Sequence, residues 1–125
     1  MDSSKIVSEY LRHLQDLNVE GLLSLFGDVC SIDMPLNDRV LNGKDELRSF
    51  YTGLLGRWKQ VTVTPGAILT NDELAMAEFT FDLVLTDDST FSDSTVDVFF
   101  VTDGRISLLR AYTDTFPLRK AFGML

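Results

Sequence analysis

The chain has 125 residues and a formal net charge of -8, and 45% of its residues are hydrophobic. This is the size of one domain with a sizeable core, and we expect a single domain over residues 1–125. The acidic balance, without a basic face, argues against nucleic acids and anionic membranes as partners, and no stretch approaches the roughly 20 apolar residues of a membrane span. The polar N-terminus lacks the features of a signal peptide, so we expect a soluble, cytoplasmic protein.

The chain contains one cysteine, Cys30, and one histidine, His13. An internal disulfide and a metal site of several His or Cys ligands are therefore excluded, and we expect neither a metal nor a cofactor. Cys30 falls in an apparent strand, where a buried small apolar residue is a more frequent role than a nucleophile.

The first part of the chain has helical periodicity. Apolar residues recur at three- and four-residue spacing in residues 3–17, which predicts a helix capped by Ser3 or Ser4. A second short helix is predicted at residues 19–26, with Gly27 as its stop. A short strand at 29–34 and an extended piece at 39–41 lead to a third helix that opens at Gly43. Its buried side is expected to carry Leu47, Phe50, Tyr51, Leu54 and Leu55.

From residue 58 onward the period changes to two, which is typical of strands. We expect one strand from residue 58 to the turn at 71–72, with a bulge at Pro65-Gly66. Further strands are expected at 74–86, 90–101 and 105–114, the last two joined by a tight turn at Asp103-Gly104. The tail, residues 115–125, is expected to dock through Phe116, Leu118 and Phe122.

Helices followed by an antiparallel meander indicate an α+β domain with helices packed on one face of a curved sheet. Within residues 90–101, Asp97 stands among Val96, Val98, Phe99 and Phe100. A charge inside an apolar strand is costly unless something uses or satisfies it, so Asp97 is the first candidate for a functional group. Because both faces of this strand are apolar, the outer face requires a second cover, which a partner subunit would provide.

Three stretches carry a family resemblance: YLRHLQDLNVEGLLSLFGD, GKDELRSFY and VDVFFVTDGRISLLRAYTD. They resemble, in this order, the first helix pair, the third helix and the last hairpin of the nuclear-transport-factor-2-like superfamily, and within it of the SnoaL-like polyketide-cyclase and ketosteroid-isomerase branches. The resemblance implies a cone-shaped, curved antiparallel (mixed) sheet with three N-terminal helices over its concave face. It also implies a pocket for a small molecule between helices and sheet, and a homodimer formed through the outer sheet face.

In ketosteroid isomerases, a tyrosine of the first helix and an aspartic acid of a strand form an oxyanion hole, while a second aspartate shuttles the proton. The resemblance places Tyr10 and Asp97 in the first two roles. The shuttle position falls on Met34, which cannot accept a proton. Asp33, one residue earlier, and His13, three residues after Tyr10, are therefore the candidates for proton transfer.

The implied pocket wall is mostly apolar, which suits a hydrophobic carbonyl compound held by one or two polar anchors. Besides the four candidate catalytic residues, the wall is expected to contain Leu14, Met34, Phe50, Tyr51, Trp58, Ala77, Phe79, Phe81, Phe99, Leu109 and Ala111. Two functions stay open at this point. One is a cofactor-independent isomerase or cyclase that works by acid–base chemistry, and the other is a non-catalytic ligand-binding or dimeric assembly module of the same fold.

The last strand separates the chain from another branch of the superfamily. In limonene-epoxide-hydrolase-like enzymes an aspartate of this strand would fall on Ala111, and their arginine on or near Thr80, so that reaction is disfavoured. By alternation, Arg110 and Asp114 share the opposite face of the strand from Ala111, where we expect an ion pair on the outer side of the sheet.

Overall fold

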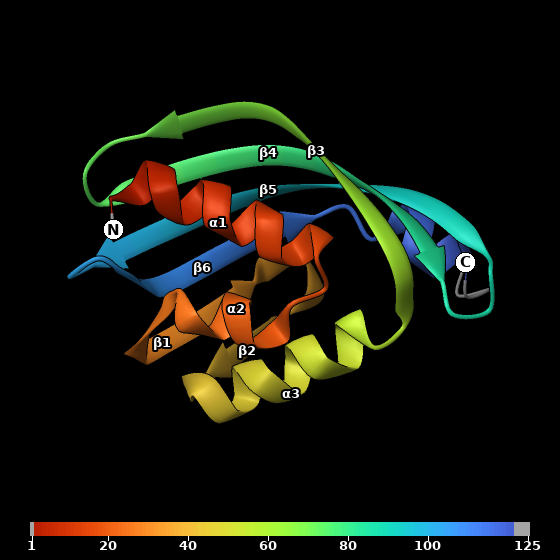
Figure 1. Ribbon diagram of the computed structural model, residues 1–125, viewed down its shortest axis with the longest axis horizontal. Coiled ribbons are helices and arrows are strands. Elements are labelled where there is room, and N and C mark those ends of the chain that lie inside the picture. The colour runs from red at the N-terminus through yellow and green to blue at the C-terminus, as the bar shows by residue number, and fades with distance from the viewer. Residues whose placement is uncertain (1, 122–125) are drawn as a thin grey trace.

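The computed structural model describes residues 2–121. Within this range the chain forms helices, one 3-10 turn and a single sheet (Figure 1). In chain order the elements are α1 (Ser3–Gln15), α2 (Val19–Ser24), β1 (Phe26–Met34), η1 (Pro35–Asn37), β2 (Arg39–Asn42), α3 (Gly43–Leu55), β3 (Trp58–Thr70), β4 (Leu74–Leu85), β5 (Thr90–Thr102), β6 (Arg105–Thr113) and α4 (Phe116–Ala121). The predicted α+β class and the predicted order of elements are confirmed.

The corner between α1 and α2 is tighter than predicted. The cap of α1 is Asp2, whose carboxylate accepts a hydrogen bond from the backbone N–H of Lys5 at 2.9 Å, in place of the predicted Ser3 or Ser4. The helix ends at Gln15, two residues early, because Leu17 adopts a left-handed backbone conformation with φ of 54°. Asn18 then caps α2 by accepting from the N–H of Gly21 at 2.9 Å.

The predicted boundary at Gly27 is wrong. Helix α2 ends at Ser24, and Gly27 lies inside β1, which begins at Phe26. The strand starts early because Phe26 pairs with Ile106 of β6, and both side chains are fully buried. A run of apolar residues has the same pattern at the end of a helix and at the start of a buried strand, and here the contact with β6 decides.

The sheet has six strands in the order β2-β1-β6-β5-β4-β3. Strands β1 and β6 are parallel, and the other neighbouring pairs are antiparallel. The predicted bulge is present, as a register shift between Pro65 and Ile68 in the pairing of β3 with β4. Figure 1 shows α1, α2 and α3 on one side of the curved sheet, so the arrangement predicted from the resemblance is confirmed.

The two faces of the sheet have different compositions. The inner face, under the helices, carries the core row of Ala75, Phe99, Leu109 and Ile32, each at most 2% exposed. The outer face carries a row that crosses the whole sheet through paired positions. Its members are Leu69, Met76, Val98, Arg110, Asp33 and Val40. Burial of the inner row contributes roughly 2 kcal/mol per large apolar side chain.

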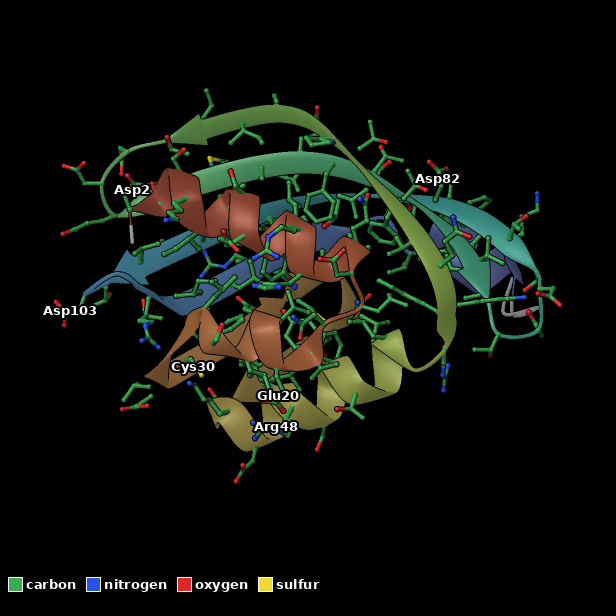
Figure 2. All side chains as sticks on the ribbon, viewed as in Figure 1. Asp2, Glu20, Cys30, Arg48, Asp82 and Asp103 are labelled. Atoms are coloured by element: carbon green, nitrogen blue, oxygen red, sulfur yellow. The ribbon has the colours of Figure 1, made fainter. Side chains whose placement is uncertain are left out.

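The prediction that Cys30 is buried is confirmed, whereas the contact between Glu20 and Arg48 was not predicted. Cys30 is buried in β1, as predicted, and burial raises the pKa of its thiol. Glu20 and Arg48 face one another between α2 and α3 (Figure 2), and both carboxylate oxygens accept hydrogen bonds from the guanidinium at 3.1 Å. Because both side chains are exposed and solvent screens their charges, the pair contributes little to stability.

The tail differs in part from its prediction. A short helix, α4, follows β6 with Pro117 in its first turn, but the Phe116 side chain is 57% exposed instead of docked. The side chain of Leu118 and residue Phe122 lie outside the described part of the chain. None of the helices in residues 2–121 has the length and apolar character needed to cross a lipid bilayer.

Candidate functional site

The candidate site is built on the inner face of β5. Alternation along this strand points Asp93, Thr95, Asp97 and Phe99 under the helices, and all four are buried. Asp97 is 3% exposed. Its directly paired neighbours are Ala77 on β4 and Ala111 on β6. These small side chains offer the carboxyl no hydrogen bond, and the tyrosines that interact with it belong to helices α1 and α3.

Two tyrosines approach this region from the helices. Tyr10 of α1 and Tyr51 of α3 are 4% and 1% exposed, and their hydroxyl oxygens lie 2.8 Å apart. The Tyr10 ring packs edge-on against Phe99, the inward neighbour of Asp97 two positions along β5, with the ring centres 5.2 Å apart. Helices α1 and α3 therefore place two phenols over the stretch of β5 that holds the buried carboxyl.

Burial controls the protonation of all three groups. It raises the pKa of Asp97 to about 7, against the opposing effect of a hydrogen bond from Thr95. Burial also raises the pKa of Tyr10 well above its ordinary value, and the nearby Tyr51 and Asp97 add to the effect. The pKa of Tyr51 is raised by burial and by Asp97, although its hydrogen bond with Tyr10 opposes the rise. At neutral pH the site thus contains two neutral phenols beside a carboxyl that exchanges its proton.

A line of hydroxyl groups continues from Asp97 along the inner face. Thr95 donates its hydroxyl hydrogen to Oδ1 of Asp97 at 2.7 Å, and its oxygen lies 3.0 Å from the hydroxyl of Thr113 on β6. Asp93 is the next inward residue of β5 and is 5% exposed. Burial raises the pKa of Asp93 to about 6, against a hydrogen bond from the N–H of Ser94 and in the same direction as the charge of Asp114.

Asp33 does not join this group. Its carboxylate accepts a hydrogen bond from Nε of Arg110 at 3.1 Å on the outer face of the sheet, while its neighbour Met34 is buried on the inner face. The offset of one residue in a strand turns the side chain to the opposite face. The expected outer-face ion pair of Arg110 therefore forms with Asp33, its partner in the β1–β6 register, and not with Asp114 as predicted.

His13 also lies elsewhere. Its Nδ1 is 3.4 Å from the side-chain nitrogen of Asn18, and its Nε2 is 3.6 Å from a carboxylate oxygen of Glu9. The ring packs against Gly21, where an added Cβ would lie 2.3 Å from Nδ1. The two ring nitrogens thus face Asn18 at the corner of α1 and α2 and Glu9 within α1, and no contact joins His13 to the Tyr10–Tyr51 pair among the hydrogen bonds of the described residues.

The residues expected to line the pocket all lie in or against the core. Leu14, Met34, Tyr51, Trp58, Ala77, Phe79, Phe99 and Leu109 are buried, and Phe50, Phe81 and Ala111 pack against them half-buried. Trp58 and Phe81 stack at 5.8 Å between ring centres. Ala77 and Phe99 have no accessible surface, so side chains fill the space around these two residues in place of the expected opening.

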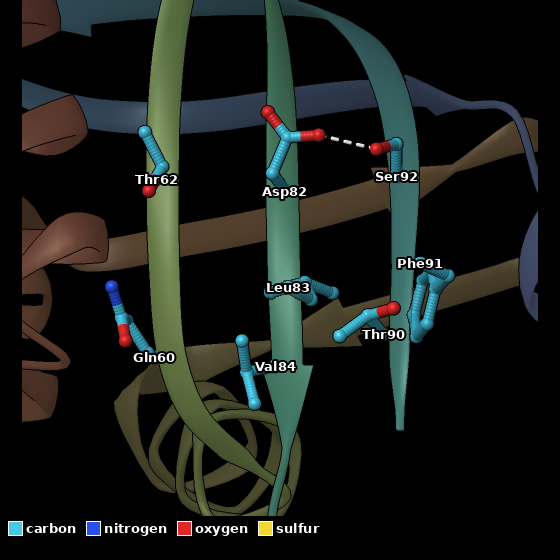
Figure 3. Close-up of a pocket in the computed structure, with 8 residues that line it drawn as sticks. All are labelled: Gln60, Thr62, Asp82, Leu83, Val84, Thr90, Phe91 and Ser92. Carbon is cyan, nitrogen blue, oxygen red and sulfur yellow. Dashed lines mark hydrogen bonds between the residues drawn. The ribbon is translucent and has the colours of Figure 1, made fainter. Parts of the chain in front are cut away.

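Two cavities are formed mainly by side chains of the opposite, outer face of the sheet. One, of about 310 Å³, is formed at the far ends of β3, β4 and β5 by outward side chains such as Thr62, Asp82 and Ser92 (Figure 3). Asp82 accepts a hydrogen bond from the hydroxyl of Ser92 there. Another, of about 590 Å³, lies across β3 to β6 beside Glu78 and Tyr112. Asp97, which is 3% exposed, lines neither of these two cavities, although Thr95, which donates a hydrogen bond to it, is among the residues that line the second.

Four residues of the site were not assigned a chemical role by sequence reasoning. Tyr51 was expected only to line a pocket, and Asp93, Thr95 and Thr113 were not singled out. The period of two along residues 90–101 does place Asp93 and Thr95 on the face of Asp97, so this part of the signal was available. The hydroxyl pairs of Tyr51 with Tyr10 and of Thr113 with Thr95 depend on contacts between distant segments.

Comparison with solved structures shows the same fold in proteins of low sequence identity. SalBIII, an epoxide hydrolase/cyclase-like enzyme in pyran ring formation of the polyether salinomycin, matches with a TM-score of 0.78 and 20% identity over 91% of this chain and 92% of that one. An LEH-like epoxide hydrolase of M. tuberculosis matches with a TM-score of 0.77 and 22% identity over 96% and 88%. A protein of Catenulispora acidiphila with a ketosteroid isomerase-like fold, solved with trimethylamine, matches with a TM-score of 0.81 and 13% identity over 94% and 92%.

Sequence comparison gives the family. No curated protein sequence matches the chain. The profile of the SnoaL-like domain matches residues 7–109, which extend from the first turns of α1 to β6 and include Tyr10, Tyr51 and Asp97. The chain therefore belongs to the SnoaL-like domain family.

Proposed function

We propose that this protein is a cofactor-independent acid–base catalyst that isomerises or cyclises a hydrophobic carbonyl compound. The observation that carries the proposal is the placement of Asp97, with a pKa of about 7, on the inner sheet face beneath the phenols of Tyr10 and Tyr51. A general base or acid is most effective when its pKa lies near the working pH. The SnoaL-like family of this chain, together with its structural similarity to a cyclase-like enzyme and an epoxide hydrolase, is compatible with this chemistry.

In the proposed mechanism the tyrosines stabilise the developing negative charge. Either hydroxyl can be the donor in the Tyr10–Tyr51 pair. In the mechanism that we propose, Tyr51 donates to the oxygen of Tyr10, and the hydrogen of Tyr10 is then free to be donated to the carbonyl oxygen of the substrate. Such a donor, held in a site without water, stabilises the transition state by about 3 kcal/mol. Since both phenols stay neutral at neutral pH, they donate hydrogen bonds and do not themselves remove the proton.

Asp97 is proposed to move the proton. Its carboxylate form removes the proton next to the carbonyl, and the resulting acid returns that proton at the new position. Asp33 and His13, the earlier candidates for this step, are engaged by Arg110 and by the α1–α2 corner. Because side chains fill the inner face around Ala77 and Phe99, binding of the substrate must displace some of the side chains between the helices and the sheet.

Exchange of substrate hydrogen for deuterium tests the proposal without knowledge of the natural substrate. Hydrophobic cyclic ketones would be incubated with the protein in D₂O, and exchange next to the carbonyl followed by NMR. Asp97→Asn should abolish exchange, Tyr10→Phe should slow it by roughly 100-fold, and the outer-face control Asp33→Asn should leave it unchanged. Binding of a ketone without exchange, or full exchange by Asp97→Asn, would contradict the proposal; the first result would favour the non-catalytic binding module.

The proposed partner is a second copy of the chain. On the outer face, Val96, Val98 and Phe100 of β5 are half-buried, and the neighbouring Met76 and Tyr112 are 42% and 39% exposed. An antiparallel sheet with a solvated outer face alternates apolar and polar residues, and this strand does not. A homodimer formed through the outer face would cover these side chains.

A further inference from the structure

The hydrogen bond to the Asp97 carboxyl comes from its own strand. Thr95 lies two residues before Asp97, on the same inward face of β5, and is 4% exposed. Its Oγ1 donates to Oδ1 of Asp97 at 2.7 Å. The paired residues on the adjacent strands, Ala77 and Ala111, have no side-chain hydrogen-bonding groups. The two oxygens of the carboxyl are therefore inequivalent, and Oδ1 is held by a threonine hydroxyl.

Thr95 is itself held by a second hydroxyl. Thr113 is its paired residue on β6, and the two Oγ1 atoms lie 3.0 Å apart. A hydroxyl has one hydrogen to donate. When that of Thr95 is donated to Asp97, the hydrogen between the threonines must come from Thr113. The direction of the chain is thus Thr113 to Thr95 to Asp97 whenever Asp97 is ionised.

We propose that Thr95 is a positioning residue for proton transfer, holding Oδ1 of Asp97 so that Oδ2 accepts and returns the proton, while Thr113 keeps Thr95 oriented as a donor. This inference rests on the proposed function of Asp97. It adds that the carboxyl works through one defined oxygen, and that two threonines outside the tyrosine pair control its orientation and its proton affinity.

The proposal predicts how the proton affinity of Asp97 responds to substitution. A hydrogen bond donated to a carboxylate favours the charged form, and the Thr95 hydroxyl accordingly lowers the pKa of Asp97 against the effect of burial. The other titratable groups that interact with the carboxyl are Tyr10 on α1 and Tyr51 on α3. Asp93 lies four residues away on the same face of β5, and burial raises its pKa to about 6. Both tyrosines are neutral at neutral pH, so they contribute no charge that would obscure the effect of Thr95.

The experiment is a ¹³C NMR titration of the aspartate carboxyls, with the Asp97 signal assigned by its loss in Asp97→Asn. Thr95→Val keeps the branched shape of the side chain but removes the donor, and should raise the midpoint of Asp97 by roughly half a unit to one unit. Thr113→Val should raise it by less, and Thr95→Ser, which retains a hydroxyl, should keep it near the wild-type value. Thr80→Val is the matched control, because the hydroxyl of Thr80 faces Ser94 on the exposed side of the β4–β5 pair.

The same variants are then compared in the exchange assay across pH. The proposal requires that the pH profile of Thr95→Val shifts upward with the midpoint and that Thr95→Ser restores it. An unchanged Asp97 midpoint in Thr95→Val, or a shifted midpoint with an unchanged rate profile, would overturn the positioning role. If the wild-type protein shows no exchange but the midpoint moves, the proposed catalytic function fails while the coupling of Thr95 to Asp97 stands.

Discussion

The hydroxyl oxygens of Tyr10 and Tyr51 lie 2.8 Å apart although the two residues are 41 positions apart in the chain. The contact joins α1 to α3 over the inner face of the sheet and satisfies two phenols in an otherwise apolar core. The contact also gives the two tyrosines different roles, because the hydroxyl that donates its one hydrogen to the other tyrosine has no hydrogen left to donate to a ligand. The direction of this one hydrogen bond therefore decides which tyrosine meets the substrate.

Tyr51→Phe tests that direction. The Tyr10 hydroxyl would lose its donor, and the free energy of unfolding should fall by about 1 kcal/mol, as expected for one buried hydrogen bond. Exchange activity should fall by roughly 10-fold, less than for Tyr10→Phe, because Tyr51 acts through Tyr10. Urea unfolding and the ketone exchange assay measure the two effects. A larger activity loss in Tyr51→Phe than in Tyr10→Phe would reverse the assignment.

The raised pKa of Asp97 predicts a dependence of stability on pH. The native state binds this proton more tightly than the unfolded chain, whose aspartates titrate near 3.8. The contribution to stability is fully present below pH 3.8 and is lost as pH rises through about 7, a change on the order of 4 kcal/mol. Burial also raises the pKa of Asp93, to about 6, and adds a loss of the same sign within this window.

Asp97→Asn provides the measurement. The amide cannot ionise and can still accept the hydrogen bond from Thr95, so the variant should be more stable than the wild-type protein at pH 8 and nearly equal to it at pH 4. Urea unfolding between these pH values compares the two proteins, with Asp33→Asn as the exposed-face control. If the difference in stability between the wild-type protein and Asp97→Asn does not change with pH across this range, the pKa of Asp97 is not raised in the native state.

Much of the fold was predictable because its signals are local. The period of two in β4 and β5 correctly separated Ala75 and Ala77 from Met76, and Asp97 from Val98. The same rule explains why Asp33, a candidate for proton transfer, faces away from the inward Met34 and pairs with Arg110 on the outer face. Where two structures share one local pattern the prediction failed, as at Gly27, where contact of Phe26 with β6 converted an apparent helix end into a strand.

The candidate site was predictable only in part. Asp97 was found from its charge inside an apolar strand and Tyr10 from a resemblance, and both side chains are buried between the helices and the sheet. The Tyr10–Tyr51 contact and the Thr95–Thr113 pair arise from tertiary packing and register, which no local pattern specifies. His13 shows the opposite case: its helical spacing from Tyr10 indicated the pocket, but the left-handed residue Leu17 turns the chain so that Asn18 and Gly21 meet its ring.

Gly21→Ala tests the packing at this corner. Alanine usually stabilises a helix relative to glycine, but at Gly21 the added Cβ would lie 2.3 Å from His13 and 2.6 Å from Asn18. We expect a loss of about 1–3 kcal/mol in the free energy of unfolding. Gly53→Ala in α3 is the matched control, because nothing lies within 4 Å of its Cβ and it should gain about 0.5–1 kcal/mol. Equal effects of the two substitutions on the free energy of unfolding would show that the side chains of His13 and Asn18 move aside for the added Cβ at no cost.

The outer sheet face supplies the last prediction. Met76 lies in the row that crosses the sheet, beside Val98, and its 42% exposure means that a change there leaves the core intact. If the outer face forms the homodimer, the wild-type protein sediments as a dimer at micromolar concentration. Met76→Lys should then sediment as a monomer, because a lysine in each copy would place unpaired charges in an apolar interface. Val29→Lys, at an 88% exposed position of β1 outside the row, should remain dimeric. A monomeric wild-type protein, or a Met76→Lys variant that remains a dimer, would show that the apolar side chains of the outer sheet face do not form a dimer interface.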